Sequence, residues 1–210
     1  MAEPSTDRGR ETRDRIVIAA ARLFHARGVN ATTVDDVLAA SASGKGQFYR
    51  YFQSREDLLA AVVRHQTEQY LAPQQTALER LESWDELGRY LADLVSDHRR
   101  RGLVGGCPVG GLALELADHD EGPRKQLADA LDGWQASLAA GLERLAAHGL
   151  LEREAPVQRL AAATMAAIQG AYLLATVHRD GDVMARALED ALARLRSYEP
   201  GGRDAEDGTV

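Results

Sequence analysis

The seven residues from Lys45 to Tyr51 (KGQFYRY) combine side chains that suit contact with DNA. The cations Lys45 and Arg50 and the two tyrosine hydroxyls can bond phosphate oxygens. The amide of Gln47 can pair with the edge of an adenine, and Gly46 allows a close approach to the DNA backbone. A helix beginning here would also offer free N–H groups to a phosphate. The alternative is a small packing helix whose aromatic residues belong to a core.

Two short helices joined by a tight turn would position these side chains. Thr33 with Asp36 three residues later predicts the capped start of the first helix. The small-residue break SASG at 41–44 follows, and the second helix is predicted over 45–52. With a longer amphipathic helix over 10–27, this pattern predicts a three-helix unit containing a helix-turn-helix.

The remainder of the chain also has helical patterning. Ala, Leu, Arg and Glu dominate over β-branched and aromatic residues, which favours helix over sheet. Ser83 with Glu86 predicts another capped helix. We therefore predict an all-α protein with a disordered basic arm (1–9), a helix-turn-helix DNA-binding domain (10–55), a helical regulatory and dimerisation domain (56–198) and a disordered tail (199–210).

Charge and composition restrict the function. Residues 1–55 hold nine Arg/Lys and six Asp/Glu, a balance of +3, whereas the whole chain carries −7. The single cysteine, Cys107, excludes an internal disulfide and favours a reducing compartment. It is either a small buried hydrophobe or a redox sensor. Because we find neither a signal peptide nor an apolar run of about 18 residues, we expect a cytoplasmic protein with no membrane contact.

No sequence pattern indicates catalysis or metal binding. The six histidines show no metal-ligand spacing, and we read the cluster Asp118-His119-Asp120 as a cap or loop. G-x-S-x-G, Walker A and G-x-G-x-x-G motifs are missing from the sequence. We predict no metal, no cofactor and no enzyme activity.

The segment TTVDDVLAASASGKGQFYRYFQSREDLL resembles the DNA-binding region of the TetR family of bacterial repressors, and the likeness covers about residues 10–63. The turn departs from the usual Ala-Gly-Val-Ser. We infer that Gly44 supplies the flexibility of the usual turn glycine and that Ser43 takes a capping or phosphate-binding role. Tyr51 replaces the commoner His and keeps a hydrogen-bond donor there.

The resemblance implies a set of DNA contacts. By this resemblance, the residues expected to contact phosphates are Thr33, Ser43, Lys45, Tyr49, Tyr51 and Arg55, and those expected nearest the bases are Gly46, Gln47 and Arg50. Arginines 8, 10, 13 and 15 either add backbone or minor-groove contacts or are solvated charges. A second motif, GGCPVGGLA at 105–113, resembles the regulatory domain of the subgroup containing lincomycin-resistance and flavonoid-responsive repressors.

The last two helices are candidates for a dimer interface. Residues 156–178 are apolar nearly all round, so this helix must be covered on every side. With the stripe over 182–197 it could form a four-helix bundle between two chains, as the family resemblance also implies. The alternative is burial within its own domain.

The resemblance implies a small-molecule effector enclosed by the helices of the second domain. The candidate lining residues, which could equally be ordinary core, are Trp84, Tyr90, Trp134, Met165 and Tyr172. The expected function is a homodimeric transcriptional repressor that binds double-stranded DNA at a palindromic operator and is released by a small hydrophobic or aromatic effector. Alternatives are a helical enzyme or carrier with a vestigial helix-turn-helix, and a protein-interaction adaptor.

Overall fold

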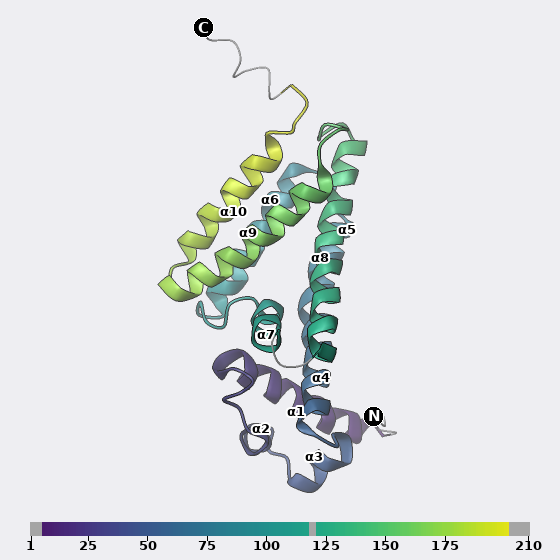
Figure 1. The fold of residues 1–210 in the computed structure, drawn as a ribbon, viewed down its shortest axis with the longest axis vertical. Helices are drawn as coiled ribbons and strands as arrows, with labels where there is room; N and C mark the ends of the chain where they lie inside the picture. Colours follow the sequence, from purple (N-terminus) through teal and green to yellow (C-terminus); the bar gives the residue numbers. More distant parts are fainter. Residues whose placement is uncertain (1–5, 118–120, 202–210) are drawn as a thin grey trace. The chain divides into compact units, whose positions relative to one another are not determined.

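The computed structural model describes residues 6–117 and 121–201, and this part of the chain consists of helices and their connections, without β-strands (Figure 1). The all-α prediction is confirmed. The elements are α1 (Asp7–Arg27), α2 (Val34–Ala40), α3 (Lys45–Tyr51), α4 (Arg55–Gln66), the π-helical turn η1 (Thr67–Leu71), α5 (Ala72–Glu79), α6 (Trp84–Arg100), α7 (Pro108–Leu116), α8 (Glu121–Ala147), α9 (Val157–His178) and α10 (Gly181–Arg196).

The helices divide into two compact units. The first, the reading unit, comprises residues 1–71 and 108–130; the second, the regulatory unit, comprises 72–107 and 131–210. This division differs from the predicted boundary at residue 55. Because α4 and α7 both contact α1, residues 56–71 and 108–130 group with the helix-turn-helix rather than with the regulatory unit.

The reading unit is built on the apolar face of α1. The i, i+4, i+7, i+8 spacing predicts an apolar face of Ile16, Ala20, Leu23 and Phe24; Ile16, Ala20 and Phe24 are buried, and Leu23 is half-buried. From α3, Phe48 and Phe52 enter the same core, and their ring centroids lie 5.4 Å apart. The burial of these two rings fixes which side of α3 faces solvent.

Helix α1 begins earlier than predicted. The Thr6 hydroxyl accepts a hydrogen bond from the N–H of Gly9 at 3.2 Å, and Asp7 adds a negative charge to the first turn. Residues 7–9 are therefore helical rather than part of a disordered arm. Residues 1–5 of the predicted arm, the cluster at 118–120 and the tail beyond 201 lie outside the described residues. Residues 199–201 form a turn after α10.

The turn between α2 and α3 corrects our inference about its residues. Ala42 adopts the left-handed conformation, with φ of 49°, at the position of the usual turn glycine. Gly44 has φ of −89° and ψ of 160° and occupies the N-cap of α3, so it does not supply the unusual backbone conformation. Ser43 does not cap α3; its hydroxyl donates to the carbonyl of Ser41 at 3.3 Å. The turn therefore keeps a left-handed backbone conformation at residue 42, although this residue is alanine and not the usual glycine.

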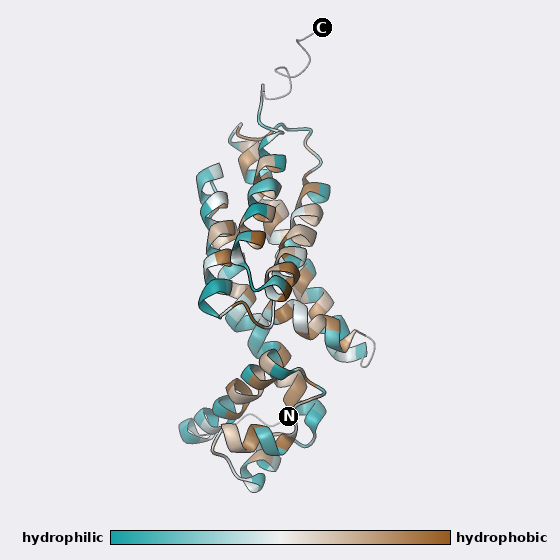
Figure 2. Ribbon diagram, turned by 90° about the vertical axis from the view of Figure 1, so that its left-hand side faces the viewer, coloured by the Kyte–Doolittle hydropathy of each residue, from teal (hydrophilic) through white to brown (hydrophobic). Residues whose placement is uncertain are grey.

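The regulatory unit contains the two C-terminal helices and α6, and α10 contacts both α9 and α6. Asp180 accepts from the N–H of Asp182 at 2.8 Å and caps the start of α10. Hydrophilic and hydrophobic residues alternate along the helices (Figure 2). Contrary to our expectation, one helix, α9, is long and apolar enough to span a membrane. A core helix of a soluble protein meets this criterion too, so the evidence for a membrane is weak.

Side-chain caps define the start of α6, as predicted. Ser83 Oγ accepts from the N–H of Glu86 at 3.3 Å, and Glu86 Oε2 accepts from the N–H groups of Ser83 and Glu82 at 3.1 and 2.7 Å. These bonds satisfy donors that the helix itself leaves without partners. The hydrogen bond from Glu82 is the main reason why the pKa of Glu86 lies below its ordinary value.

Replacing the cap hydroxyl should destabilise the protein. We expect Ser83→Ala to lower the free energy of unfolding by about 1 kcal/mol, because the N–H of Glu86 loses its acceptor. Urea unfolding followed by tryptophan fluorescence measures this, since Trp84 and Trp134 both lie in the regulatory unit. Ser96→Ala, in the middle of the same helix, is the matched control. Equal midpoints for the two variants would contradict the role of the cap.

The Glu86 carboxylate should also make stability depend on pH. Because its folded pKa is lowered, its contribution is complete above the pKa of an unfolded glutamate, about 4.3, and is lost as pH falls through the lower folded value. Glu86→Gln keeps an acceptor oxygen but cannot titrate. We expect its Tm to fall less than that of the wild type between pH 6 and 3. Glu79→Gln, on the exposed surface of α5, should instead follow the wild-type curve.

Candidate nucleic-acid interface and effector site

Helix α3 has one apolar side that is buried in the core and one polar side that faces solvent. Phe48 is 1% exposed, whereas its neighbour Tyr49 is 61% exposed. Lys45, Gly46 and Arg50 are exposed as well. The aromatic residues of α3 therefore do two different things: the phenylalanines pack inside, and Tyr49 projects outward. An exposed tyrosine hydroxyl and exposed cations on one short helix are groups that can bond phosphate oxygens.

Two of the predicted contacts on α3 already have partners within the protein. Lys45 Nζ lies 3.3 Å from Asp35 Oδ1, and both side chains are more than two-thirds exposed. Such a surface pair contributes little, so the ammonium can exchange Asp35 for a phosphate. Gln47 Oε1 accepts from the N–H of Gly44 at 2.9 Å and completes the cap of α3. Bidentate pairing with adenine uses both the oxygen and the nitrogen of the amide, so Gln47 would first have to release this bond.

Thr33 starts α2 with the predicted capping box. Its hydroxyl accepts from the N–H of Asp36 at 3.1 Å and donates to Asp36 Oδ2 at 2.6 Å. The hydrogen bond from the Thr33 hydroxyl is the main cause of the lowered pKa of Asp36. A phosphate at Thr33 would therefore compete with a carboxylate for the hydroxyl proton.

The remaining residues predicted to contact DNA are less exposed than Lys45 and Tyr49. Tyr51 and Ser43 are half-buried. Arg55 does not present its guanidinium group freely: Nη2 donates to the carbonyl of Val29 and, at 3.4 Å, to that of Thr32. The sequence offered no signal for this, because the two carbonyls lie more than twenty residues earlier in the chain.

The N-terminal arginines also differ in their surroundings. Arg10 forms an ion pair with Asp7, and Arg13 Nη1 lies 3.5 Å from Asp14 Oδ1. Arg15 Nε donates to the Ser41 carbonyl at 2.9 Å and so ties α1 to the turn of the helix-turn-helix. Arg15 thus has a structural contact, which neither of the two predicted alternatives had included.

In the regulatory unit, two of the five candidate effector residues form a buried hydrogen bond. Trp134 Nε1 donates to the Tyr90 hydroxyl at 2.7 Å. Burial, above all, raises the pKa of Tyr90, and Tyr172 and Cys107 act in the same direction. Tyr172 also meets His98 edge to face, with ring centroids 5.0 Å apart. Tyr90, Trp134 and Tyr172 are therefore brought into one buried region.

Trp84 and Met165 are buried too, but Trp84 has its own partners. Its Nε1 donates to the Leu150 carbonyl at 3.2 Å, and the Arg196 guanidinium lies 5.9 Å from its ring centroid. Met165 is buried on α9. Cys107 is also buried, which agrees with its reading as a small hydrophobe.

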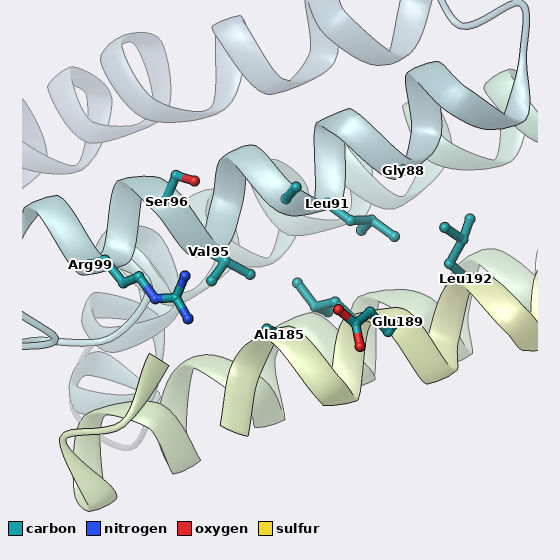
Figure 3. Close-up of a pocket in the computed structure, with 10 residues that line it drawn as sticks. Gly88, Leu91, Val95, Ser96, Arg99, Ala185, Glu189 and Leu192 are labelled. Atoms are coloured by element: carbon teal, nitrogen blue, oxygen red, sulfur yellow. The ribbon is translucent and has the colours of Figure 1, made fainter. Parts of the chain in front are cut away.

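Two surface pockets lie beside α6. One, of about 350 Å³ between α5 and α6, includes Tyr90 together with Arg80 and Arg89. The other is a groove of about 330 Å³ between α6 and α10 (Figure 3). In the groove, Leu91 and Val95 face Ala185 and Leu192, and the charged Arg99 and Glu189 flank them. Sequence analysis missed this groove, because it arises from the packing of helices that are about ninety residues apart.

The outer face of α9 is apolar. Leu173 and Val177 are 59% and 68% exposed, and Leu174 is exposed beside them. Leu160, Thr164 and Ile168 are buried on the other side of the helix, and α9 packs against α10. The sequence predicts that α9 must be covered on every side. Its own chain buries one side of α9 and leaves the other side exposed.

Comparison with known proteins shows to which family this arrangement of helices belongs. Residues 16–62 match the model for the bacterial regulatory proteins of the tetR family, and residues 84–190 match the C-terminal domain of LmrA/YxaF-like transcriptional regulators. An uncharacterised helix-turn-helix transcriptional regulator of Lactococcus lactis is 35% identical over 83% of this chain and 88% of its own. The repressor NemR of Escherichia coli is 28% identical, over 89% of this chain and 93% of its own.

A solved structure agrees with these sequence matches. The TetR transcriptional regulator from Chloroflexus aurantiacus superposes with a TM-score of 0.80 at 27% identity, covering 90% of this chain and 96% of that one. The matched relatives are regulators of transcription and not enzymes. With its helix-turn-helix, its buried α3 anchor and its separate helical regulatory unit, the chain belongs to the TetR family of bacterial regulatory proteins.

Proposed function

We propose that this protein is a cytoplasmic, homodimeric repressor that binds a palindromic operator and leaves it when a small hydrophobic or aromatic effector binds. The observation that carries the proposal is the orientation of α3, with Phe48 and Phe52 buried and Lys45, Tyr49 and Arg50 directed to solvent. Family membership supports a ligand-responsive DNA-binding regulator, and NemR is named as a repressor.

We assign phosphate contacts to Lys45, Tyr49 and Tyr51, with Thr33 and Ser43 at the adjoining helix end and turn. Gly46, Gln47 and Arg50 lie on the part of α3 proposed to face the bases. Lys45 and Gln47 leave Asp35 and the Gly44 N–H on binding, so each exchanges one polar partner for another. Such exchange keeps the free protein's polar groups satisfied without blocking the site.

Two copies of the chain would pair through α9 and α10, which correspond to the predicted segments 156–178 and 182–197. The exposed Leu173, Leu174 and Val177 support this proposal, because an apolar patch on an otherwise polar protein marks an interaction surface. Pairing of α9 and α10 from two chains gives a four-helix bundle. It also presents two α3 helices to two operator half-sites.

The effector would bind in the regulatory unit at Tyr90, Trp134 and Tyr172. The buried Trp134–Tyr90 hydrogen bond places a polar group inside an aromatic region, and this combination suits a flat ligand with one polar substituent. The pocket between α5 and α6 reaches Tyr90 and is the route of entry that we favour. Binding must favour one arrangement of the dimer over another in order to release DNA.

Exchange of Lys45 for Ala tests the DNA interface. We expect wild-type protein to shift a duplex taken from upstream of its own gene in a band-shift assay. Lys45→Ala should bind this duplex about 3–10-fold more weakly at moderate salt. The slope of log affinity against log salt should fall by roughly one for each phosphate that Lys45 contacts, since fewer counterions are released.

The control for this experiment is Lys125→Ala. Lys125 is an exposed lysine of α8, also in the reading unit but outside the proposed interface. It should keep the wild-type affinity and salt slope. If both variants behave alike, the interface is misplaced, and if wild-type protein shows no preference for the upstream duplex over an unrelated one, the repressor proposal fails.

A charge on the outer face of α9 tests the dimer. We expect Leu173→Glu to sediment as a monomer at micromolar concentrations where the wild type is a dimer, because a carboxylate would be buried in the apolar interface. Leu114→Glu places the same charge on an exposed leucine of α7 and should leave the dimer intact. A wild-type protein that sediments as a monomer would refute the proposed pairing.

A further inference from the structure

The loop between α1 and α2, residues 28–32 (GVNAT), is held by several hydrogen bonds in the reading unit. Gly28 has φ of 88°, a conformation that favours glycine, and its carbonyl accepts from the Thr32 hydroxyl at 2.8 Å. Val29 and Thr32 are buried. Because Thr33 follows directly and caps α2, the position of this loop sets the position of the first helix of the helix-turn-helix.

Two charged side chains from distant parts of the chain hold the loop. From the start of α4, Arg55 donates to the carbonyls of Val29 and Thr32. From α7, Glu115 Oε1 accepts from the N–H of Asn30 at 2.9 Å. We call Arg55 and Glu115 the loop clamp. Together they bind both kinds of backbone group, carbonyl and N–H, within one short segment.

Glu115 fits closely because residue 28 is glycine. A Cβ atom at this position would lie 3.1 Å from Glu115 Oε1 and 3.3 Å from Oε2. These separations are shorter than ordinary van der Waals contact, so any larger residue would push the carboxylate away from Asn30. Gly28 thus serves both the backbone conformation of the loop and the approach of Glu115.

Both members of the loop clamp lie on helices of the reading unit that are close in the chain to its connections with the regulatory unit. Helix α4 runs through η1 to Leu71, after which the chain enters that unit, and α7 begins where the chain returns from it at Pro108. The segment just before α7 is anchored in the regulatory unit. Arg101 Nη1 donates to the Gly106 carbonyl at 3.0 Å, and Arg179 Nη1 donates to the Leu103 carbonyl at 2.5 Å.

We propose that Glu115 and Arg55 are positioning residues for DNA binding: by fixing the α1–α2 loop, they let α4 and α7 set the placement of α2 and α3. This inference rests on the proposed DNA-binding function and deepens it, because it names the residues through which the regulatory unit acts. A movement of α7 would pull on Asn30, and a movement of α4 would pull on Val29 and Thr32. Arg55 therefore acts on DNA through the loop rather than through a phosphate.

Hydrogen exchange tests the clamp without DNA. In Glu115→Ala, we expect the amides of residues 28–40 to exchange roughly 3–10-fold faster than in the wild type, because the Asn30 N–H loses its acceptor. Exchange in α9 and α10 should not change. Glu115→Gln keeps an acceptor oxygen and should restore the slower exchange. Glu79→Ala, a loss of charge on the surface of α5, is the matched control.

DNA binding then tests the consequence. On the upstream duplex, Glu115→Ala should bind several-fold more weakly than Glu115→Gln and Glu79→Ala, with no change in salt slope. Arg55→Lys is the second variant: it keeps the cation, and so would keep a phosphate contact, but a single ammonium does not reproduce the guanidinium fork. We expect it to lose affinity at unchanged salt slope and to speed exchange over residues 28–40.

The outcomes are separable. Unchanged exchange at residues 28–40 in both Glu115→Ala and Arg55→Lys overturns the clamp, whether or not the protein binds DNA. Faster exchange with unchanged operator affinity overturns its role in DNA binding. If wild-type protein does not prefer the upstream duplex, the proposed repressor function fails while exchange still decides the clamp. Should Glu115→Ala lose its helical circular dichroism, Arg55→Lys and Glu115→Gln supply the same comparison.

Discussion

The proposed DNA-binding surface depends on the burial of Phe48 and Phe52 in the core of the reading unit. Phe48 lies on α3 and Phe52 follows directly at its C-cap, so the two rings, four residues apart, occupy one side of a helix of only two turns. A helix this short has little stability of its own, and its orientation is set by what it buries. With the phenylalanines inside, Lys45, Tyr49 and Arg50 have no orientation left except toward solvent.

Polar side chains around this core mainly satisfy backbone groups. Thr33 and Asp36 cap α2, Gln47 caps α3, and Arg15 bonds the turn between them. The N–H groups at helix ends need such partners. Several side chains that could contact DNA are thus engaged in the free protein, and binding exchanges their partners instead of exposing new ones.

The regulatory unit follows a different principle. Its two tryptophans, Tyr90 and Tyr172 are buried, and Trp134 donates a hydrogen bond to Tyr90, while the apolar exposure of this unit is concentrated on the outer face of α9. Buried polar groups that are hydrogen-bonded hold a region in one defined conformation. An exposed apolar face is typical of a surface that binds another molecule. An internal site for a ligand and an external site for a second chain are therefore compatible in one small helical unit.

The sequence alone determined the helical class, the helix-turn-helix, the caps at Thr33 and Ser83 and the inward side of α1, because each depends on residues within a few positions of one another. It also indicated the family through one continuous segment. Tertiary structure alone decided that Arg55 and Glu115 hold the α1–α2 loop, that α7 groups with the reading unit and that a groove separates α6 from α10. Each of these features joins segments that are distant in the chain, and local spacing carries no information about which distant backbone groups will meet.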